Sequence, residues 1–516
     1  MPAAQMPPSF HGMTDIGKVF LVGAGPGDPG LLTLKGQAAL KLADLVLYDG
    51  LVNPLILRHS NATAERTNRV GSGSQRRLDQ AEINQRLIDA ARSGKTVVRL
   101  KGGDPFIFGR GSEEALALAK AGIPYEVIPG ITAATAAAEY AGISLTHREH
   151  ASAVAFVTGH EDPTKPESAL DYGQLAGFPG TLVFYMGLHR IAKIASALID
   201  HGKPVETPVA VISRGSTPLQ RTITGTLQDI PELVESAQLR PPSLIIVGSC
   251  ILQREEINWF ETLPLAGLTI GIARPEQQAD AAIDLVLAYG GRPLVMPTIE
   301  INELTDWSDV DQAIDQLDSI DWMIFTSVNG VNSFLGRILQ RGRDARSLSS
   351  LKIACIGPAT AQELERYSLR ADLVPAVFRG ENLAAELKPY VSGKRVLWPR
   401  ADRGREVLPE ELRSSGAEVL SLIVYKHEDL ENLDSEIVAA LRGGEVDWIC
   451  LSSPVIARNC ARLLTALNLA SIPKFAAISP VTEAAAREAG LELAAVATEH
   501  TWPGLIDALI RSIGEA

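Results

Sequence analysis

Short apolar runs alternate with helical patterns along this chain, and this alternation restricts its fold more than any other feature. A short apolar run bounded by polar, glycine or proline residues is typical of a strand that is buried on both faces of a sheet. In the first half, such runs lie at 19–22, 45–48, 96–100, 125–128, 153–157, 181–185, 208–212 and 243–247. Helical patterns lie between most of them, so we expect an α/β fold with largely buried strands.

The second half contains an internal repeat. SIDWMIFTSVNGVNSF (319–334) is similar to EVDWICLSSPVIARNC (445–460), and LKIACIGPATAQELE (351–365) is similar to PKFAAISPVTEAAAR (473–487). Each copy has the pattern of a strand, a loop and a helix. Two copies are too few for a solenoid, so we predict two similar α/β lobes with a ligand cleft between them.

The chain has 516 residues, which is more than one hydrophobic core supports. The pattern of apolar runs restarts after NWFETLPLAG (258–267), and this restart places the main domain boundary near residue 263. Residues 1–16 lack the basic and apolar segments of a signal peptide and are predicted to form a flexible tail.

Composition argues against several classes of function. A formal net charge of −13 disfavours nucleic-acid binding, and no apolar run is long enough to span a bilayer. The four cysteines form no CxxC pair, which favours buried thiols in a reducing compartment, so we predict a cytoplasmic protein. His147 and His150 have no recognisable third ligand, and no metal is predicted.

The charge is unevenly distributed. Residues 66–101 carry nine basic and three acidic side chains, and residues 394–405 carry five basic side chains and one acidic side chain. Each cluster is either a solvated surface or a site that captures a small polyanion such as a polycarboxylate. Charge alone favours the solvated surface.

The loop VGAGPGDPG (22–30) follows the first apolar run. It does not fit the dinucleotide fingerprint GxGxxG, because Asp28 occupies the place of the third glycine, nor the phosphate loop GxxxxGK[ST], because Leu31 follows Gly30. Pro26 and Pro29 also lack N–H donors. The loop is therefore a stiff turn at the carboxyl end of a strand, and it is either part of a ligand-binding edge or a plain connection.

Several motifs together resemble those of the tetrapyrrole methylase family. GAGPGDPGLLTLKG, LYDGLV, RLKGGDPFIFGRG, PGITAA, GISLTHR, VTGH, FYMGL and PSLIIVG occur in this order within residues 17–262. The likeness is strongest to the uroporphyrinogen-III C-methyltransferases. It implies two α/β subdomains, S-adenosylmethionine as co-substrate without a metal, a small tetrapyrrole substrate, and a homodimer formed through this half.

The resemblance also implies roles for residues that match the motifs. Asp49 matches a residue proposed as a proton acceptor, and Arg110 and Glu113 match residues that handle the tetrapyrrole. The residues that match the methyl-donor site are Pro26, Gly102, Gly103, Asp104, Ile107, Thr132, Ala133, Met186 and Gly215.

One position departs from the family pattern. Many members have a lysine with a proton-donor role after the glycine that corresponds to Gly71, whereas this chain has Ser72. The role is therefore unassigned; either Arg69, Arg76 or Arg77 supplies the charge, or the lysine is dispensable.

Residues 263–516 resemble the uroporphyrinogen-III synthases through TSVNGV, CIGPATA, LIVYKHED, LSSPVIA and AISPVTEAA. This family is bilobed, in agreement with the repeat, and its chain enters one lobe, forms the second and then returns. The resemblance therefore implies one lobe from 263–299 and 424–516, and another from 300–423.

The resemblance implies candidate residues here as well. Tyr425 matches the family's candidate acid for the loss of a hydroxyl from hydroxymethylbilane, although it is equally well interpreted as an ordinary strand tyrosine. The residues expected to bind substrate carboxylates are Arg274, Ser327, Arg400, Ser453 and Thr482, with the three hydroxyl residues on cleft loops.

Together the two resemblances imply a bifunctional enzyme of tetrapyrrole biosynthesis. The C-terminal half would cyclise hydroxymethylbilane to uroporphyrinogen III, and the N-terminal half would methylate it twice to precorrin-2, a precursor of siroheme and cobalamin. As alternatives, the N-terminal half methylates another corrin intermediate, or the C-terminal half is a non-catalytic tetrapyrrole-binding module.

Overall fold

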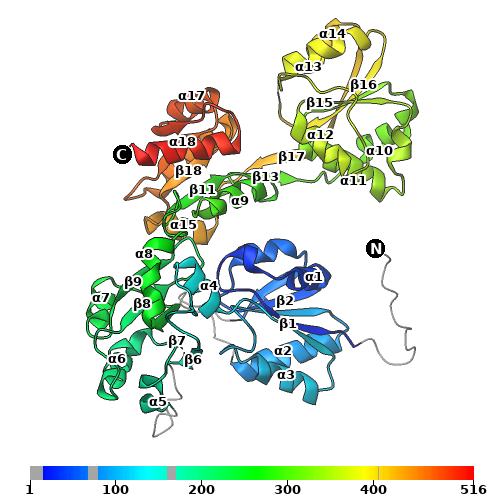
Figure 1. Cartoon of the computed structure of the whole chain (residues 1–516). Coiled ribbons are helices and arrows are strands. Elements are labelled where there is room, and N and C mark those ends of the chain that lie inside the picture. The colour runs from blue at the N-terminus through cyan, green and yellow to red at the C-terminus, as the bar shows by residue number, and fades with distance from the viewer. Residues whose placement is uncertain (1–15, 68–78, 160–169, 405, 516) are drawn as a thin grey trace. The chain divides into compact units, whose positions relative to one another are not determined.

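The computed structural model describes residues 16–67, 79–159, 170–404 and 406–515. It separates into two compact units, one of Met1–Thr269 with Val286–Arg292 and the other of Ile270–Leu285 with Pro293–Ala516 (Figure 1). We call them the N-terminal and the C-terminal unit. Four five-stranded sheets are found among the described residues, and helices connect most of their strands.

The first sheet of the N-terminal unit is parallel and has the order β3-β2-β4-β1-β5. Leu21, Leu47 and Val97 face α2 and α3, whereas the neighbouring Val22 and Val46 face α1. This alternation shows that both faces are covered, as the apolar runs predict. The elements are β1 (Val19–Gly23), α1 (Leu34–Leu42), β2 (Leu45–Tyr48), β3 (Thr63–Arg66), α2 (Gln80–Arg92), β4 (Val97–Lys101), α3 (Gly111–Lys120) and β5 (Tyr125–Ile128).

The second sheet of this unit is mixed and has the order β6-β7-β10-β8-β9. Helix α4 (Ala133–Tyr140) follows the first sheet in the chain and packs through Ala134, Ala137 and Ala138 on one face of the second. It thereby joins the two sheets. The other elements are β6 (Val154–Thr158), α5 (Tyr172–Ala176), β7 (Thr181–Tyr185), α6 (Ile191–Asp200), β8 (Pro208–Ser213), β9 (Arg221–Thr226), α7 (Ile230–Ser236), β10 (Ser243–Val247), the 3-10 helix η4 (Ser249–Gln253) and α8 (Arg254–Ile257).

One sheet of the C-terminal unit takes strands from two distant parts of the chain, in the order β12-β11-β18-β19-β20. The pairs from β11 to β20 are parallel. The elements are β11 (Thr269–Ala273), α9 (Asp280–Ala288), β12 (Arg292–Val295), α15 (Ser435–Arg442), β18 (Trp448–Leu451), α16 (Pro454–Leu467), β19 (Lys474–Ala477), α17 (Pro480–Glu488), β20 (Leu493–Val496) and α18 (Trp502–Gly514).

The other sheet of this unit has the order β13-β17-β16-β14-β15. Strand β17 pairs with β16 in parallel and with β13 in antiparallel. The predicted lobe boundary between residues 423 and 424 falls inside β17, which is one continuous strand. The elements are β13 (Ile299–Asn302), α10 (Ser308–Asp315), β14 (Trp322–Phe325), α11 (Val328–Gln340), β15 (Lys352–Cys355), α12 (Pro358–Glu365), α13 (Gly380–Leu387), β16 (Arg395–Ala401), α14 (Val407–Ser414) and β17 (Glu418–Asp429).

The predicted fold class is confirmed: the structure is α/β, with largely parallel sheets and buried strands. The domain boundaries remain predictions. Two strands of the first half were not predicted, β3 and β9, and both are edge strands whose residues are mostly exposed or half-buried. Among the helices of the described residues, none combines the length and hydrophobicity needed to cross a bilayer.

Candidate active sites

Three loops of the N-terminal unit meet at the carboxyl ends of β1, β4 and β5. A Cβ atom on Gly23 would lie 2.5 Å from the Cα of Gly130, and a Cβ atom on Gly130 would overlap the carbonyl oxygen of Gly103. Gly25 and Gly103 also exchange two backbone hydrogen bonds of 3.2 and 2.8 Å. These glycines are therefore required for the close approach of the loops, which explains their spacing without a phosphate.

Two carboxylates hold these loops in place. Asp104 accepts hydrogen bonds from the backbone N–H groups of Gly130, at 3.0 Å, and Phe106, at 2.8 Å. Asp28 accepts one from the N–H of Gly30 and one from the hydroxyl of Tyr140, at 2.7 and 2.6 Å. Because its carboxylate binds backbone on two loops, Asp104 shapes the GGDP turn as well as lying within it.

The second sheet adds a tyrosine that sequence analysis missed. The hydroxyl of Tyr185 lies 2.6 Å from Thr132 Oγ1 and accepts a hydrogen bond of 2.9 Å from the N–H of Ala134. It thus caps α4, whose own N-cap residue Thr132 makes no side-chain cap bond. Burial raises the pKa of Tyr185, so it stays a neutral hydroxyl. Its position directly before Met186, in FYMG, was the available signal.

The same contacts bring together the remaining residues that were predicted for the methyl-donor site. Thr132 and Ala133 begin α4, Met186 follows Tyr185 at the end of β7, and a Cβ atom on Gly215 would overlap the Cβ of Ala137 in α4. Gly27, next to the half-buried Pro26, lies against the loop of Gly215. A Cβ atom on Gly27 would be 3.0 Å from the carbonyl oxygen of Gly215. Residues from the ends of both sheets therefore converge on α4.

Strained backbone surrounds this convergence. Phe108, Arg110, Met186, Arg214 and Ser216 are non-glycine residues with φ between 52° and 58°. Strain of this kind persists where the surrounding structure enforces it and is frequent at active sites. The exposed apolar residues beside it are Phe106, Ile107, Phe108 and Met186.

The three predicted catalytic residues of this unit lie at the same end of the first sheet. Half-buried Asp49 accepts hydrogen bonds from the N–H groups of Leu51, at 3.1 Å, and Gly102, at 3.2 Å. Arg110 donates two hydrogen bonds of 2.8 and 2.7 Å to Glu113, and this pairing lowers the pKa of Glu113. Both partners of the pair are exposed and charged at neutral pH.

Two residues of the basic stretch 66–101 are not available to a substrate. Arg99 and Lys101 are buried in β4, and their nitrogens lie 3.1 and 3.0 Å from one carboxylate oxygen of buried Glu114. Burial lowers the pKa of Lys101. Neither interpretation of the basic stretch, a solvated surface or a site for a polyanion, holds for these two residues, because β4 is covered on both faces. Ser72, Arg69, Arg76 and Arg77 lie outside the described residues.

In the C-terminal unit, helix N-termini lie at the carboxyl ends of the strands. Ser327, Ser453, Ser479 and Thr501 follow β14, β18, β19 and β20, and each hydroxyl accepts a hydrogen bond from the first turn of its own helix. Unpaired N–H groups and the helix dipole make such ends suitable for carboxylates.

Two adjoining cavities open at these ends, with volumes of about 630 and 540 Å³. The larger one is lined by the predicted residues Ser327, Arg400 and Tyr425, and the smaller one by Arg274 and Ser453. Four residues line both cavities, and sequence analysis did not single them out: Arg403, Gly404, His427 and His500. The VYKHED motif contains His427 and offered a signal for it.

Tyr425 is buried, and its hydroxyl lies 3.0 Å from Ser327 Oγ. Burial raises its pKa, so the hydroxyl keeps its proton. His427, two residues further along β17, lies 3.4 Å from Asp402 through Nδ1, and its ring centre is 5.2 Å from that of Tyr425. A hydroxyl and an imidazole thus stand side by side at the cavity wall.

The two arginines predicted to bind substrate both have partners within the protein. Arg400 is buried, with its guanidinium paired to Glu406 and 4.4 Å from the centre of the Trp398 ring. Arg274 donates to Gln278 at 3.2 Å, and burial lowers its pKa.

Thr482 was expected on a cleft loop, and this expectation is wrong. The residue lies in the first turn of α17 and is 1% exposed. Ser479 occupies the N-cap position instead, three residues earlier, and it lines the larger of the two cleft cavities. The error came from extending the loop as far as Thr482, although Pro480 already begins the helix.

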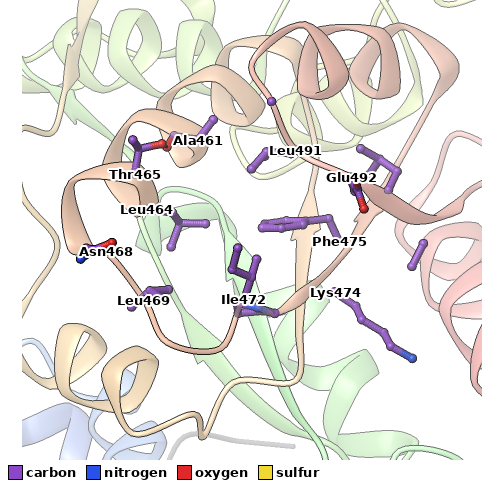
Figure 2. Close-up of a pocket in the computed structure, with 14 residues that line it drawn as sticks. Ala461, Leu464, Thr465, Asn468, Leu469, Ile472, Lys474, Phe475, Leu491 and Glu492 are labelled. Atoms are coloured by element: carbon purple, nitrogen blue, oxygen red, sulfur yellow. The ribbon is translucent and has the colours of Figure 1, made fainter.

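A third cavity of the C-terminal unit, of about 800 Å³, lies away from these residues. Figure 2 shows Leu464, Ile472 and Phe475 gathered in it, with Lys474 extending outward. Lys474 and Leu493 begin β19 and β20, so this cavity lies at the amino ends of the strands, whereas parallel sheets bind ligands at their carboxyl ends.

Comparisons with known proteins give a match for each half of the chain. The family model for Tetrapyrrole (Corrin/Porphyrin) Methylases matches residues 18–231, and the model for Uroporphyrinogen-III synthase HemD matches residues 280–507. A solved structure of the uroporphyrin-III C-methyltransferase of Thermus thermophilus, complexed with S-adenyl homocysteine, is 39% identical and covers 46% of this chain and 99% of its own, with a TM-score of 0.40.

Curated relatives fall into two groups. A siroheme synthase of Pseudomonas fluorescens is 50% identical over 249 residues, which are 48% of this chain and 53% of the relative, so the chain matches about half of that protein. The porphyrin biosynthesis protein HemD of Ruminiclostridium josui is 31% identical over 495 residues, covering 96% of this chain and 98% of the relative. The chain therefore belongs to the family of porphyrin biosynthesis proteins in which a tetrapyrrole methylase domain is fused to a uroporphyrinogen-III synthase domain.

Proposed function

We propose that the C-terminal unit closes hydroxymethylbilane to uroporphyrinogen III and that the N-terminal unit methylates this product twice to precorrin-2, with S-adenosylmethionine as methyl donor. The observation that carries the proposal is that the matched residues of each half converge at the carboxyl ends of its sheets. The two domain families also act on consecutive tetrapyrroles, which supports the assignment of both reactions to one chain.

For methyl transfer, the residues that would hold the donor are those around the glycine loops and α4. When bound, the donor supplies an electrophilic methyl group on a sulfonium. The tetrapyrrole carbon would attack that methyl as its bond to sulfur breaks, and a proton would leave the ring. Such a displacement depends on aligned reactants more than on covalent catalysis by the protein. We assign Asp49 as the acceptor of the proton.

For ring closure, the hydroxyl of the linear substrate must leave with a proton. We assign Tyr425 as the acid that donates this proton, because its hydroxyl is protonated and the residue lines the cavity. Arg274, Arg400, Ser327 and Ser453 lie where they could hold substrate carboxylates through charge-assisted or hydroxyl hydrogen bonds. Fixing a flexible chain in one shape supplies much of such a reaction's acceleration.

Two further features belong to the same proposal. We propose a homodimer formed through the N-terminal unit, following the methylase family. A cytoplasmic location is supported by the four cysteines, which are buried and free of disulfides.

The test supplies the purified full-length protein with S-adenosylmethionine and either hydroxymethylbilane or uroporphyrinogen III. We expect precorrin-2 from both substrates. Product from uroporphyrinogen III alone would support a C-terminal unit that binds tetrapyrroles without catalysis. No methylation of uroporphyrinogen III would overturn the assignment of the N-terminal unit and favour another corrin substrate.

A further inference from the structure

A cluster of metal-binding side chains lies in the N-terminal unit, on the connection between α4 and β6. His147, Glu149 and His150 each offer one ligand atom, and these atoms lie within 4.8 Å of one another. The two histidines were predicted to lack a third ligand, and the carboxylate of Glu149, between them in the sequence, offers one. The turn of the backbone brings that carboxylate to the same side as both rings.

The backbone of this turn is closed by its own hydrogen bonds. His147 and Ala151 form an antiparallel bridge with bonds of 2.9 and 3.0 Å, and the N–H of His150 donates to the carbonyl of His147 at 3.2 Å. Ala151 is buried, and Ser249 Oγ donates to the carbonyl of His150 at 3.4 Å. The turn is thus fixed to η4, and little freedom is lost when a ligand binds.

The side chains are arranged for one shared ion. The ring centres of His147 and His150 lie 4.9 Å apart at an interplanar angle of 35°. The backbone N–H of Glu149 donates to Nδ1 of His147 at 3.2 Å, so Nδ1 carries the lone pair of the neutral ring and Nε2 carries its proton. His147 would therefore bind the ion through Nδ1, and the ion would replace this hydrogen bond.

We infer that His147, Glu149 and His150 form a binding site for a divalent transition metal such as Zn²⁺, with water as the fourth ligand. Two imidazoles and one carboxylate suit zinc, with ligand distances of about 2.0–2.2 Å. The three ligand atoms must approach by small side-chain rotations, because a tetrahedral site sets them roughly 3.3 Å apart. Arg148, between them, is exposed and need not oppose the ion closely.

The position of the site gives the ion a structural role. The connection that contains it joins α4 to β6, and its first part is anchored through the carbonyl of Ala141, which accepts a hydrogen bond from Arg254 of α8. A metal ion on the following turn would fix the end of the connection before β6. The inference is independent of which tetrapyrrole the protein methylates.

The test is titration of the metal-free full-length protein with Zn²⁺ by calorimetry, and with Co²⁺ by visible absorption. We expect each chain to bind one ion tightly. The Co²⁺ spectrum should be that of an ion with nitrogen and oxygen ligands. His150→Ala should weaken binding by about tenfold or more, as should His147→Ala, and Glu149→Gln by less. Zinc should raise the melting temperature of the wild type and not that of His150→Ala.

The matched control is His189→Ala, which removes an exposed histidine of the same unit outside the cluster and should leave the tight Zn²⁺ binding unchanged. Equal binding by the wild type and by the His147→Ala, His150→Ala double variant, with both folded by circular dichroism, would overturn the inference. So would a tight ion that is lost in His189→Ala.

Discussion

In both units the candidate site lies at the carboxyl ends of the strands, but the two sites are formed by different kinds of groups. The site of the N-terminal unit is made of backbone packed against backbone, as at Gly23 and Gly130. The site of the C-terminal unit is made of hydroxyl-capped helix ends, arginines and a buried tyrosine around two cavities. The first suits a small donor held at fixed positions, and the second suits a long, flexible polyanion that needs many separate contacts.

This difference has a consequence for mutation. Where loops interlock, one added methyl group affects several loops at once. Where contacts are separate, the loss of one leaves the rest in place, unless the residue takes part in the chemistry.

The largest effect is expected for Gly23→Ala. The added methyl would lie 2.5 Å from the Cα of Gly130 and 2.7 Å from the carbonyl oxygen of Gly103, so the loops must separate. We expect methyl transfer to fall by about 100-fold or more, in line with the cost of misplacing reacting groups by 1 Å, while ring closure is unchanged. Both rates are measured on the same preparation.

The control for Gly23→Ala is Gly177→Ala, where the nearest atom to the added methyl is 3.6 Å away. Equal methyl transfer by Gly23→Ala and the wild type would show that the loops yield easily. The proposed contrast between interlocked and separate contacts would then be lost.

Tyr425→Phe is expected to act in the opposite half. Removing the hydroxyl removes the proton donor, so ring closure should slow by about 10²–10⁴-fold, while methylation of supplied uroporphyrinogen III continues. Tyr367→Phe is the control, because its hydroxyl bonds Asn332 in the same lobe without lining the cleft cavities. A rate within twofold of the wild type would exclude Tyr425 as the acid.

Asp104→Ala sharpens the role of the GGDP turn. The substitution frees the N–H groups of Gly130 and Phe106, so the turn should loosen and S-adenosylmethionine should bind about 10-fold more weakly, equivalent to about 1.4 kcal/mol. Calorimetry of the full-length protein measures this. Asp171→Ala, which removes a helix cap elsewhere in the unit, should bind normally. Unchanged binding by Asp104→Ala would show that Asp104 does not contribute to binding of the methyl donor.

A smaller effect is expected for Ser453→Ala. The loss of the N-cap hydroxyl should destabilise α16 by about 1 kcal/mol and raise the KM for hydroxymethylbilane severalfold, with kcat little changed. Chemical unfolding and steady-state kinetics measure the two quantities. A fall in kcat without a change in KM would contradict a role in substrate binding.

The smallest effect concerns alkaline pH. The pKa of Tyr425 is raised by burial, so the folded state holds this proton more tightly than the unfolded state, where the pKa is about 10. The stabilising contribution is therefore full below about pH 10 and is lost as pH rises through the raised value. The stability difference between wild type and Tyr425→Phe, measured by denaturant titration, should shrink above pH 10. A difference that grows there would have the wrong sign.

Much of the fold could be predicted, because strands buried on both faces leave a strong apolar signal. The runs at 45–48, 125–128, 181–185 and 243–247 match β2, β5, β7 and β10 residue for residue. Edge strands such as β3 escaped prediction because their exposed residues carry no such signal. Local sequence also predicted a loop position for Thr482, which is wrong because Pro480 already begins α17.

The candidate sites were predictable only as lists of residues. The sequence by itself determined the buried strands, the repeat and the order of motifs, since these depend on hydrophobic patterning and on residues close together in the chain. Only the tertiary structure decided which side chains meet: Gly23 with Gly130, Tyr185 with α4, Ser327 with Tyr425, and Lys101 with Glu114 instead of a substrate. Those pairings depend on the packing of separate elements against one another, and burial then sets the charge and the availability of each group.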